Sequence, residues 1–309
     1  MKKQKLIKVT LLTFLFFSTF ISSYAQFDKP ILQFGFGLAE PMQDTKGTYY
    51  SYEDLSNSGY QVLAINPDLF TNNYGAKTGI SFFGNGKINF DKYGITRGVV
   101  GISFNSFNTF EATKSGNVAM LNQDIHGNID TILVGANFNY TFMNFNFNLG
   151  VEIAPTSFTN KLSPYFGARV AFNSFTSNLT WTPNGSDTTH FEASDFRIGL
   201  MFDAGLEFKF SKTIGMVLGA NYNMGNLLLK NTKSAYSDYQ AWGQTNSSIN
   251  DGDGQFFSSL YNPVMINITR TVQAKQKNIN WGTIYLGVNI YLNTAKTGPK
   301  SPNKKYLNF

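Results

Sequence analysis

Residues 196–210 alternate strictly between apolar and polar side chains. The even-numbered positions are all apolar: Phe196, Ile198, Leu200, Phe202, Ala204, Leu206, Phe208 and Phe210. The odd-numbered positions include four charged residues: Arg197, Asp203, Glu207 and Lys209. Successive side chains of a β-strand point to opposite faces. This segment therefore predicts a strand with one apolar face and one charged face.

Seven other segments show the same alternation: 31–39, 79–90, 96–110, 131–142, 164–172, 214–224 and 281–292. In a soluble sandwich a second sheet must cover the apolar faces, whereas a barrel in a membrane turns them toward lipid and its polar faces inward. Charged residues make up only 14% of the chain, which also has 30 Phe and 16 Tyr. Soluble domains carry about 25% charged residues. The composition favours the membrane barrel.

The connections between the segments predict the number of strands. Four are long (40–78, 111–130, 173–195 and 225–280) and others, such as 91–95 and 211–213, are short. Outer-membrane barrels have short periplasmic turns and long outer loops, and eight strands place every long connection outside. The predicted fold class is therefore an all-β, transmembrane, antiparallel up-and-down barrel of eight strands. A ten-strand barrel that also uses 264–272 is the alternative, with two long connections on the periplasmic side.

Residues 145–153 also alternate, but out of phase with 131–142. A β-bulge adds one residue and shifts the phase of a strand. We therefore expect a bulge at Met143 and Asn144, beyond which the fourth strand continues.

The first 25 residues have the features of a cleaved secretory signal. Lysines are followed by an apolar stretch at 9–21 and by Ser23-Tyr24-Ala25, with cleavage expected after Ala25. The apolar stretch is shorter than the roughly 20 residues of a membrane-spanning helix. The expected organisation is a signal peptide at 1–25, a barrel at 26–292 and a basic, disordered periplasmic tail at 293–309. No cysteine is present, which excludes a lipid anchor on cysteine and any disulfide.

The formal net charge of +6 comes from the two ends of the chain. Four lysines lie in the signal and four more lie in the last 17 residues, so the barrel body has slightly more acidic than basic residues. Because it lacks a basic face, we expect no nucleic-acid partner.

The segment Tyr285-Leu286-Gly287-Val288-Asn289-Ile290-Tyr291-Leu292 is similar to the C-terminal signal read by the barrel-insertion machinery. Together with 163–168 and 197–210, it resembles the outer membrane protein beta-barrel domain families, of the OmpA, OmpX and OmpW type. The resemblance implies a Gram-negative outer-membrane location, contact with membrane lipid and lipopolysaccharide, and an assembly signal on Tyr285, Gly287, Ile290 and Leu292. In the families this signal ends the chain, whereas 17 residues follow it here, and no peptidoglycan-binding domain follows either. Such barrels share topology more than activity.

An eight-strand barrel is just wide enough for inward side chains to fill it or to hold one small ligand. The inward positions include Arg97, Arg169 and Arg197 as cations, with Asp203 and Glu207 as acids; Glu152, Lys87 and Lys209 lie nearby. Buried charges must be paired. We therefore expect a structural ion-pair network that fills the lumen, with a gated solute path through the same charges as the alternative.

Several short motifs point to chemistry only weakly. Asp124-Ile125-His126 together with Asp251-Gly252-Asp253 resembles pieces of omptin-type proteases, but in reverse chain order, and ordinary acidic loop residues are the preferred interpretation. Residues 250–254 lack the further acids of a calcium loop and predict a tight turn. His126 and His190 have no His or Cys companions, so we expect no transition metal and no cofactor. The tripeptide 187–189 resembles a bacterial O-glycosylation acceptor.

The long connections are rich in aromatic residues among Ser, Asn and Gly: Tyr49, Tyr50, Tyr52, Tyr60, Tyr236, Tyr239, Trp242, Phe256, Phe257 and Tyr261. Such residues either form adaptable contact surfaces or pack on one another above the barrel. The leading hypothesis is a non-enzymatic barrel for envelope integrity, adhesion or the binding of an extracellular or periplasmic protein partner. The alternatives are a narrow channel for small or hydrophobic solutes and, more remotely, a membrane protease or lipid-modifying enzyme.

Overall fold

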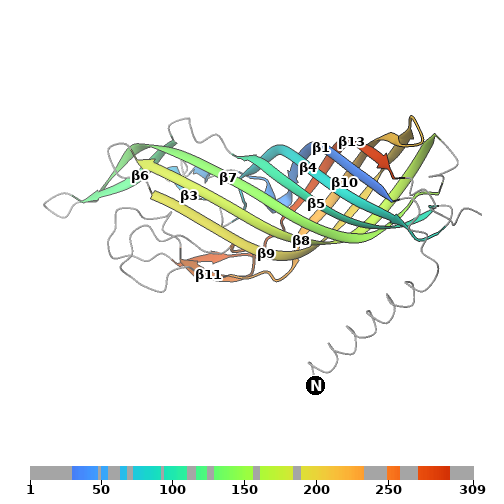
Figure 1. The fold of residues 1–309 in the computed structure, drawn as a ribbon. Coiled ribbons are helices and arrows are strands. Elements are labelled where there is room, and N and C mark those ends of the chain that lie inside the picture. Colours follow the sequence, from blue (N-terminus) through green and yellow to red (C-terminus); the bar gives the residue numbers. More distant parts are fainter. Residues whose placement is uncertain are drawn as a thin grey trace, which may run out of the picture.

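The computed structural model describes residues 30–47, 50–54, 63–67, 72–91, 94–109, 116–123, 129–155, 161–183, 189–232, 249–257 and 271–292. Within these ranges the molecule is almost entirely β-structure, and its longest strands form one sheet that curls around an enclosed lumen (Figure 1). The predicted signal peptide at 1–25 and the predicted tail at 293–309 lie outside the described residues.

Eight antiparallel strands form the barrel. They are β1 (Ile31–Met42), β4 (Ala76–Asn89), β5 (Thr96–Thr109), β7 (Ile129–Ile153), β8 (Leu162–Pro183), β9 (Thr189–Lys209), β10 (Ile214–Leu228) and β13 (Asn280–Tyr291). Their order is β5-β4-β1-β13-β10-β9-β8-β7, and pairing of β7 with β5 closes the ring. The eight-strand prediction is confirmed.

The strands are staggered as they pass around the barrel. The residue opposite Thr96 of β5 is Ile153 of β7. Moving around the barrel from each residue to the one opposite it on the next strand passes Phe166, Ala204, Ala220, Ile284, Leu38 and Ile80 and reaches β5 again at Ser106. This shift along β5 tilts the strands against the barrel axis, as closure requires. A barrel of eight strands is narrow, so the inward side chains from opposite walls are close enough to interact.

The turns at the end that carries Pro30 and Leu292 are short and locally stabilised. In the β4–β5 turn the Asp91 carboxylate accepts hydrogen bonds from the backbone N–H groups of Ile95 and Thr96, at 3.2 and 2.6 Å. In the β9–β10 turn the Ser211 hydroxyl accepts from the N–H groups of Thr213 and Ile214. Short turns are the periplasmic ones in such barrels, so we call this end the periplasmic end and the opposite end the outer mouth.

Three strands extend well beyond the barrel at the outer mouth. β7, β8 and β9 contain 25, 22 and 21 residues, whereas about 9–11 residues suffice to cross a bilayer. β6 (Gly116–Gln123) pairs with the outer half of β7, which adds a fourth strand to this extension (Figure 1). Two hairpins, β2–β3 (Tyr50–Asp54 and Leu63–Pro67) and β11–β12 (Gly254–Phe257 and Thr271–Ala274), are separate small sheets. The one described helical turn is η1 (Gln43–Thr45).

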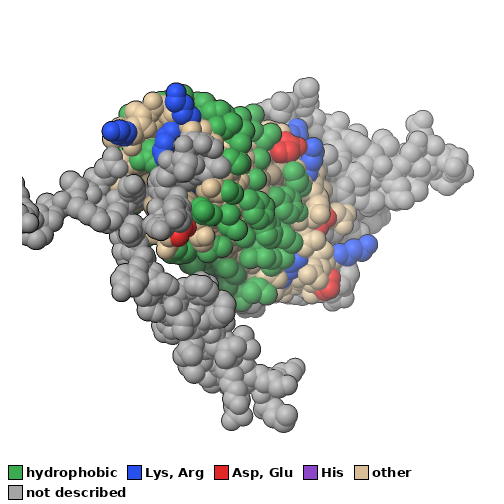
Figure 2. All heavy atoms as spheres, turned by 90° about the vertical axis from the view of Figure 1, so that its right-hand side faces the viewer, with side chains coloured by type: hydrophobic (Ala, Val, Ile, Leu, Met, Phe, Trp, Pro, Cys, Tyr) green, Lys and Arg blue, Asp and Glu red, His purple; other side chains and the backbone are tan. Residues whose placement is uncertain are grey.

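The outward face of the barrel is apolar. Many of its large hydrophobic side chains are more than one-third exposed, including Phe34, Leu38, Phe82, Val100, Phe145, Phe166, Phe202, Leu218 and Ile284. On the face drawn in Figure 2, hydrophobic side chains gather in a broad band, with charged side chains beyond both edges. In water, so large an exposed apolar surface would need a covering layer of protein. In a membrane the acyl chains of the lipid cover it directly. Among the described residues no helix is long and apolar enough to cross a membrane.

Two expectations about the strands are wrong. β7 pairs with both β5 and β8 in an unbroken register through Met143 and Asn144, so there is no bulge there. The phase of the strand stays constant instead, and Phe142 points into the lumen, where it is fully buried. The ten-strand alternative fails as well, because the described part of 264–272 belongs to β12, which pairs only with β11.

Candidate functional site

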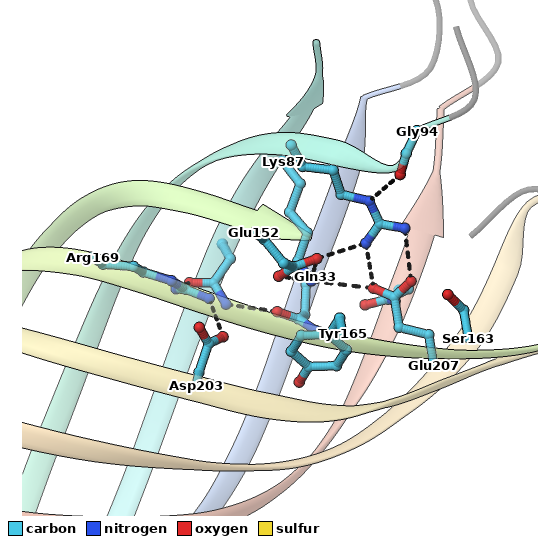
Figure 3. A network of polar contacts seen from close by, with 12 residues as sticks. Gln33, Lys87, Gly94, Glu152, Ser163, Tyr165, Arg169, Asp203 and Glu207 are labelled. Atoms are coloured by element: carbon cyan, nitrogen blue, oxygen red, sulfur yellow. Dashed lines mark hydrogen bonds and ion pairs between the residues drawn. The ribbon is translucent and has the colours of Figure 1, made fainter. Parts of the chain in front are cut away.

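Four charged side chains form a compact cluster inside the periplasmic end of the lumen (Figure 3). Arg97 Nη1 lies 2.7 Å from Glu152 Oε1 and 2.9 Å from Glu207 Oε1, and Lys87 Nζ lies 2.8 Å from Glu152 Oε2 and 3.2 Å from Glu207 Oε1. All four are at most 2% exposed. Two cations are thus balanced by two anions with multiple hydrogen bonds, which is the arrangement that offsets the desolvation of buried ions.

The strand register explains why these charges meet. Arg97 of β5 lies directly opposite Glu152 of β7, while Lys87 comes from β4 and Glu207 from β9, across the narrow lumen. Arg97 also donates to the Gly94 carbonyl, which ties the cluster to the periplasmic turn. We call these four residues the periplasmic ion cluster.

A tyrosine pair crosses the lumen next to the periplasmic ion cluster. The hydroxyls of Tyr165 and Tyr285 are 2.5 Å apart, and the Lys87 ammonium lies 4.7 Å from the centre of the Tyr165 ring. Phe83 packs edge-on against Tyr285. A Cβ atom at Gly219 would lie 2.6 Å from both hydroxyls, so this glycine makes room for the pair.

The middle of the lumen is lined by side-chain amides around a separate ion pair, Arg169 with Asp203. Arg169 Nη2 lies 2.5 Å from Asp203 Oδ2, and Arg169 Nη1 donates to the side chains of Asn85 and Asn148. Further toward the outer mouth, asparagine side chains hydrogen-bond one another in a continuous series: Asn105, Asn144, Asn146, Asn148 and Asn173. The alternation of Asn on β7 places Asn144, Asn146 and Asn148 on the same inward face.

An aromatic layer separates this polar region from the outer mouth. Phe142 stacks on Phe175 with ring centroids 5.9 Å apart, and Phe107 and Phe175 each contact Trp281 edge-on at 6.0 Å. Tyr74 stacks on the outer side of Phe142 at 5.5 Å. The four rings of Phe107, Phe142, Phe175 and Trp281 come from β5, β7, β8 and β13 and are at most 4% exposed.

The segment 249–252 of the long β10–β13 connection enters the outer mouth and binds Arg197. Arg197 Nε and Nη2 donate to the two Asp251 carboxylate oxygens, both at 2.8 Å, and Nη2 also donates to the Ile249 carbonyl. Asn226 donates to Asp251 at 2.8 Å as well. Asp195 adds a second acid 3.0 Å from Arg197 Nη2. We call Ile249–Gly252 the mouth segment.

Two titratable groups outside the barrel strands pack against the mouth segment. Tyr74 donates its hydroxyl to the Asn250 carbonyl, and burial together with the nearby Asp251 charge raises the pKa of Tyr74 well above its ordinary value of 10.0. Lys277 lies over the Tyr74 ring, with its ammonium 5.8 Å from the ring centre. Burial lowers the pKa of Lys277 from 10.5 to about 8, against the opposing effect of Asp251, Asp44 and Asp253.

The structure places the predicted lumen charges in three groups, not in one network. Arg97 and Glu207 meet in the periplasmic ion cluster, Arg169 pairs with Asp203, and Arg197 binds Asp251 at the opposite end of the barrel. Lys209 lies over the Tyr291 ring near the periplasmic end. Their assignment as a structural ion-pair network stays a prediction about their role.

The sequence analysis did not predict that residues of the long connections contact side chains in the lumen. Asp251 was expected to be an ordinary acidic loop residue, yet it is fully buried beside Arg197. The inward aromatic layer was missed because the expected bulge assigned Phe142 to the lipid face. The inward asparagines of β7 were not predicted either, although they form an alternating series in the sequence that could have indicated them.

The residues of the predicted assembly signal divide between the two faces of β13. Ile290 and Leu292 are on the lipid face, while Tyr285 points into the lumen. A Cβ atom at Gly287 would lie 2.6 Å from the Phe34 carbonyl oxygen of β1, so this position needs glycine for strand pairing itself. Recognition of these residues by the insertion machinery stays a prediction.

The weak motifs are only partly covered by the described residues. Residues 124–128 and 187–188, with His126, lie outside them, as does the His190 side chain. Within the described residues no group of three or more His, Cys, Asp or Glu side chains is arranged to hold a metal ion.

Residues 146–241 match the model of the "Opacity family porin protein". The matched segment begins in the inner half of β7, includes β8, β9 and β10 and continues past the end of β10. It contains the lumen residues Arg169, Arg197, Asp203 and Glu207 and part of the apolar outward face, including Phe166, Phe202 and Leu218. The chain is an outer-membrane β-barrel, and its residues 146–241 are similar to the Opacity family. The family resemblance inferred from the barrel-strand motifs is thereby confirmed, together with the outer-membrane location.

No curated protein matches the chain. Among solved structures it is similar to Neisserial surface protein A (NspA), with 11% identity and a TM-score of 0.40 over 84% of this chain and 96% of that one. It is also similar to Ail, the attachment invasion locus protein of Yersinia pestis, with 12% identity and a TM-score of 0.34 over 86% of this chain and 99% of that one. A second structure of Ail contains the heparin analogue sucrose octasulfate.

Proposed function

We propose that this outer-membrane barrel is a non-enzymatic, non-conducting scaffold that contributes to envelope integrity. It presents an outer sheet, formed by β6 and the outer parts of β7, β8 and β9, for adhesion or partner binding. The observation that carries the proposal is the filled lumen. The periplasmic ion cluster, the tyrosine pair, the amides around Arg169, the aromatic layer and the mouth segment follow one another along the barrel axis, and most of their side chains are buried.

Each layer blocks ions for a different physical reason. A charged cluster with balanced signs holds no free site for a passing ion, because every charge is already engaged. The aromatic layer supplies no hydrogen-bonding groups other than the Trp281 N–H, so a hydrated ion would lose its water there without replacement. Because the layers lie one after another along the lumen, loss of any one layer would leave the lumen closed to ions.

The outer sheet supports the scaffold role. The extended parts of β7, β8 and β9 with β6 stand beyond the apolar band, on strands that continue without interruption into the barrel wall. A strand anchored in the membrane presents its outer half at low conformational cost, which favours binding by a preorganised surface.

Conductance of the purified protein in planar bilayers tests the closed lumen. We expect no stable single-channel steps in concentrated potassium chloride, whereas large steps from the parent protein would overturn the proposal in favour of a solute channel.

Adhesion is tested on intact bacteria that produce the protein. A variant in which 117–135 is replaced by a short turn removes the β6–β7 hairpin but leaves the barrel strands. We expect parent cells, and not variant cells, to bind one of a panel of coated surfaces that includes heparin. Heparin is included because a solved complex of Ail contains a heparin analogue. Equal binding by both strains, with equal resistance to detergent, would remove the scaffold role.

A further inference from the structure

The polar middle of the lumen contains a cavity of about 20 Å³, measured as the space open to the centre of a water molecule. Its lining includes Ser81, Ser103, Asn221, Asn223 and Thr283, together with Arg169 and Asp203. A single water needs about 10–15 Å³ on this measure. The cavity is therefore large enough for water and too small for an organic solute.

Four buried polar atoms on the lining residues have no hydrogen-bond partner within the part of the chain that the structure describes. They are Arg169 Nε, Asp203 Oδ1, Asn223 Oδ1 and Trp281 Nε1. Their residues are at most 5% exposed. A buried polar group without a partner costs free energy, and native proteins rarely leave several such groups in one place.

The types of these atoms identify what would bind them. Arg169 Nε and Trp281 Nε1 are donors, while Asp203 Oδ1 and Asn223 Oδ1 are acceptors. A bare cation would be repelled by the two donors and an anion by the two acceptors. Water, with two protons and two lone pairs, complements both kinds.

We propose that the cavity is an occluded hydration site, in which ordered water links the Arg169–Asp203 ion pair of β8 and β9 to Asn223 of β10 and Trp281 of β13. The tyrosine pair closes it toward the periplasm, and the aromatic layer closes it toward the outer mouth. Because Trp281 belongs both to the aromatic layer and to the cavity lining, the water fixes the ring that seals the site.

This inference goes beyond the proposed scaffold function, because a barrel that failed to bind any partner would still contain the site. Conversely, a parent protein that conducts ions would overturn the closed lumen without showing that the cavity is dry. The two proposals are therefore separable by experiment.

A crystal structure of the parent protein that resolves ordered water is the direct test. We expect density within hydrogen-bond distance of Asp203 Oδ1 and Asn223 Oδ1. An empty cavity would overturn the inference.

A substitution that fills the cavity gives a second test, in which wet and dry cavities predict opposite signs. Ser103→Val adds apolar volume at the cavity wall, and Ser106→Val on the same strand adds the same β-branched side chain on the opposite face as a matched control. If water occupies the cavity, the valine displaces it and leaves the four atoms without partners. We expect Ser103→Val to unfold at a lower urea concentration than Ser106→Val. A dry cavity would instead be filled favourably, and an equal or higher midpoint for Ser103→Val would overturn the inference.

Thiol labelling tests occlusion, because the chain contains no cysteine of its own. Ser103→Cys places a single thiol at the cavity wall, and Thr78→Cys places one at an exposed position on the outer rim. We expect a water-soluble methanethiosulfonate reagent to label Cys at 78 at least about tenfold faster than Cys at 103 in the folded protein, since the buried thiol needs an opening of the barrel. Equal rates would show that the site is open to solvent.

Discussion

Arg197 and Asp251 form a two-point ion pair across 54 residues of sequence, with both hydrogen bonds at 2.8 Å. Arg197 is part of the barrel wall, and Asp251 belongs to the mouth segment in the β10–β13 connection. Asn226 and the Asn231 backbone N–H donate to the same carboxylate. Asp251 therefore holds the β10–β13 connection against the barrel wall at the outer mouth.

Asp251→Ala should detach the mouth segment. Loss of one partner from a buried pair typically costs about 3–5 kcal/mol, and we expect the lower part of this range because Asp195 still contacts Arg197. The measurement is the free energy of unfolding in detergent, combined with protease cleavage of the outer connection on whole cells. Asp253→Ala is the matched control, because Asp253 is exposed. Equal cleavage of the two variants would contradict the role of Asp251.

Lys277 should make the stability of the outer mouth depend on pH. Its pKa of about 8 in the folded protein is below its ordinary 10.5, so between these values the unfolded chain binds the proton more strongly. Stability should therefore rise from pH 8 to pH 10, by up to about 3 kcal/mol. Above pH 10 Tyr74 ionises in the unfolded chain first and reverses the trend. Unfolding midpoints at pH 7, 8, 9 and 10 test this, with Lys277→Met expected to remove the rise. A rise that persists in this variant would assign it to another group.

Glu207→Gln should destabilise the barrel more than the charge-matched double variant does. Glu207 contacts both Arg97 and Lys87, so the single change leaves an excess of buried positive charge, at a cost of about 3–5 kcal/mol. In Glu207→Gln with Lys87→Met the cluster is neutral again, and we expect much of the loss to be recovered. A double-mutant cycle on unfolding free energies measures the coupling. Simple additivity would show that the cluster does not act as a unit.

Leu200→Arg tests which face of β9 meets lipid. A cation near the middle of the lipid face costs about 2–4 kcal/mol, and the penalty falls to about 0–1 kcal/mol near the interface. Ser174→Arg, on the outward face of the neighbouring strand closer to the rim, is the control. Refolding into lipid vesicles followed by urea unfolding gives both values. If the two arginines cost the same, the assignment of the outward face is wrong.

Leu292→Ser separates assembly in the cell from folding. The Leu292 side chain lies on the outer face, and its backbone N–H still donates to the Pro30 carbonyl in the variant. We expect normal refolding of the purified variant in detergent but reduced insertion in cells, because the predicted assembly signal loses a hydrophobic position. Gly287→Val should instead fail in both assays, since a Cβ atom there meets the backbone of β1. Normal insertion of Leu292→Ser would remove Leu292 from the signal.

Local patterns predicted part of the lumen and missed the rest. The inward positions of Arg97, Arg169 and Asp203 follow from the alternation of their own strands, because successive side chains of a strand point to opposite faces. Phe142 was assigned to the wrong face, since an apolar residue is compatible with either lipid or a buried aromatic layer. Asp251 lies in a connection without periodicity, and no local pattern indicates that such a residue returns to the wall.

The amino-acid sequence alone specified a membrane barrel of eight strands, because alternation, short periplasmic turns and scarce charge are local properties that each strand carries by itself. Which charges meet was decided only by the closed barrel. The stagger of the strands sets the height of each inward side chain, and it brings Lys87, Arg97, Glu152 and Glu207 to one level while keeping Arg197 at the other end. Pairing across a lumen depends on this closure, a property of all eight strands together that no single strand contains.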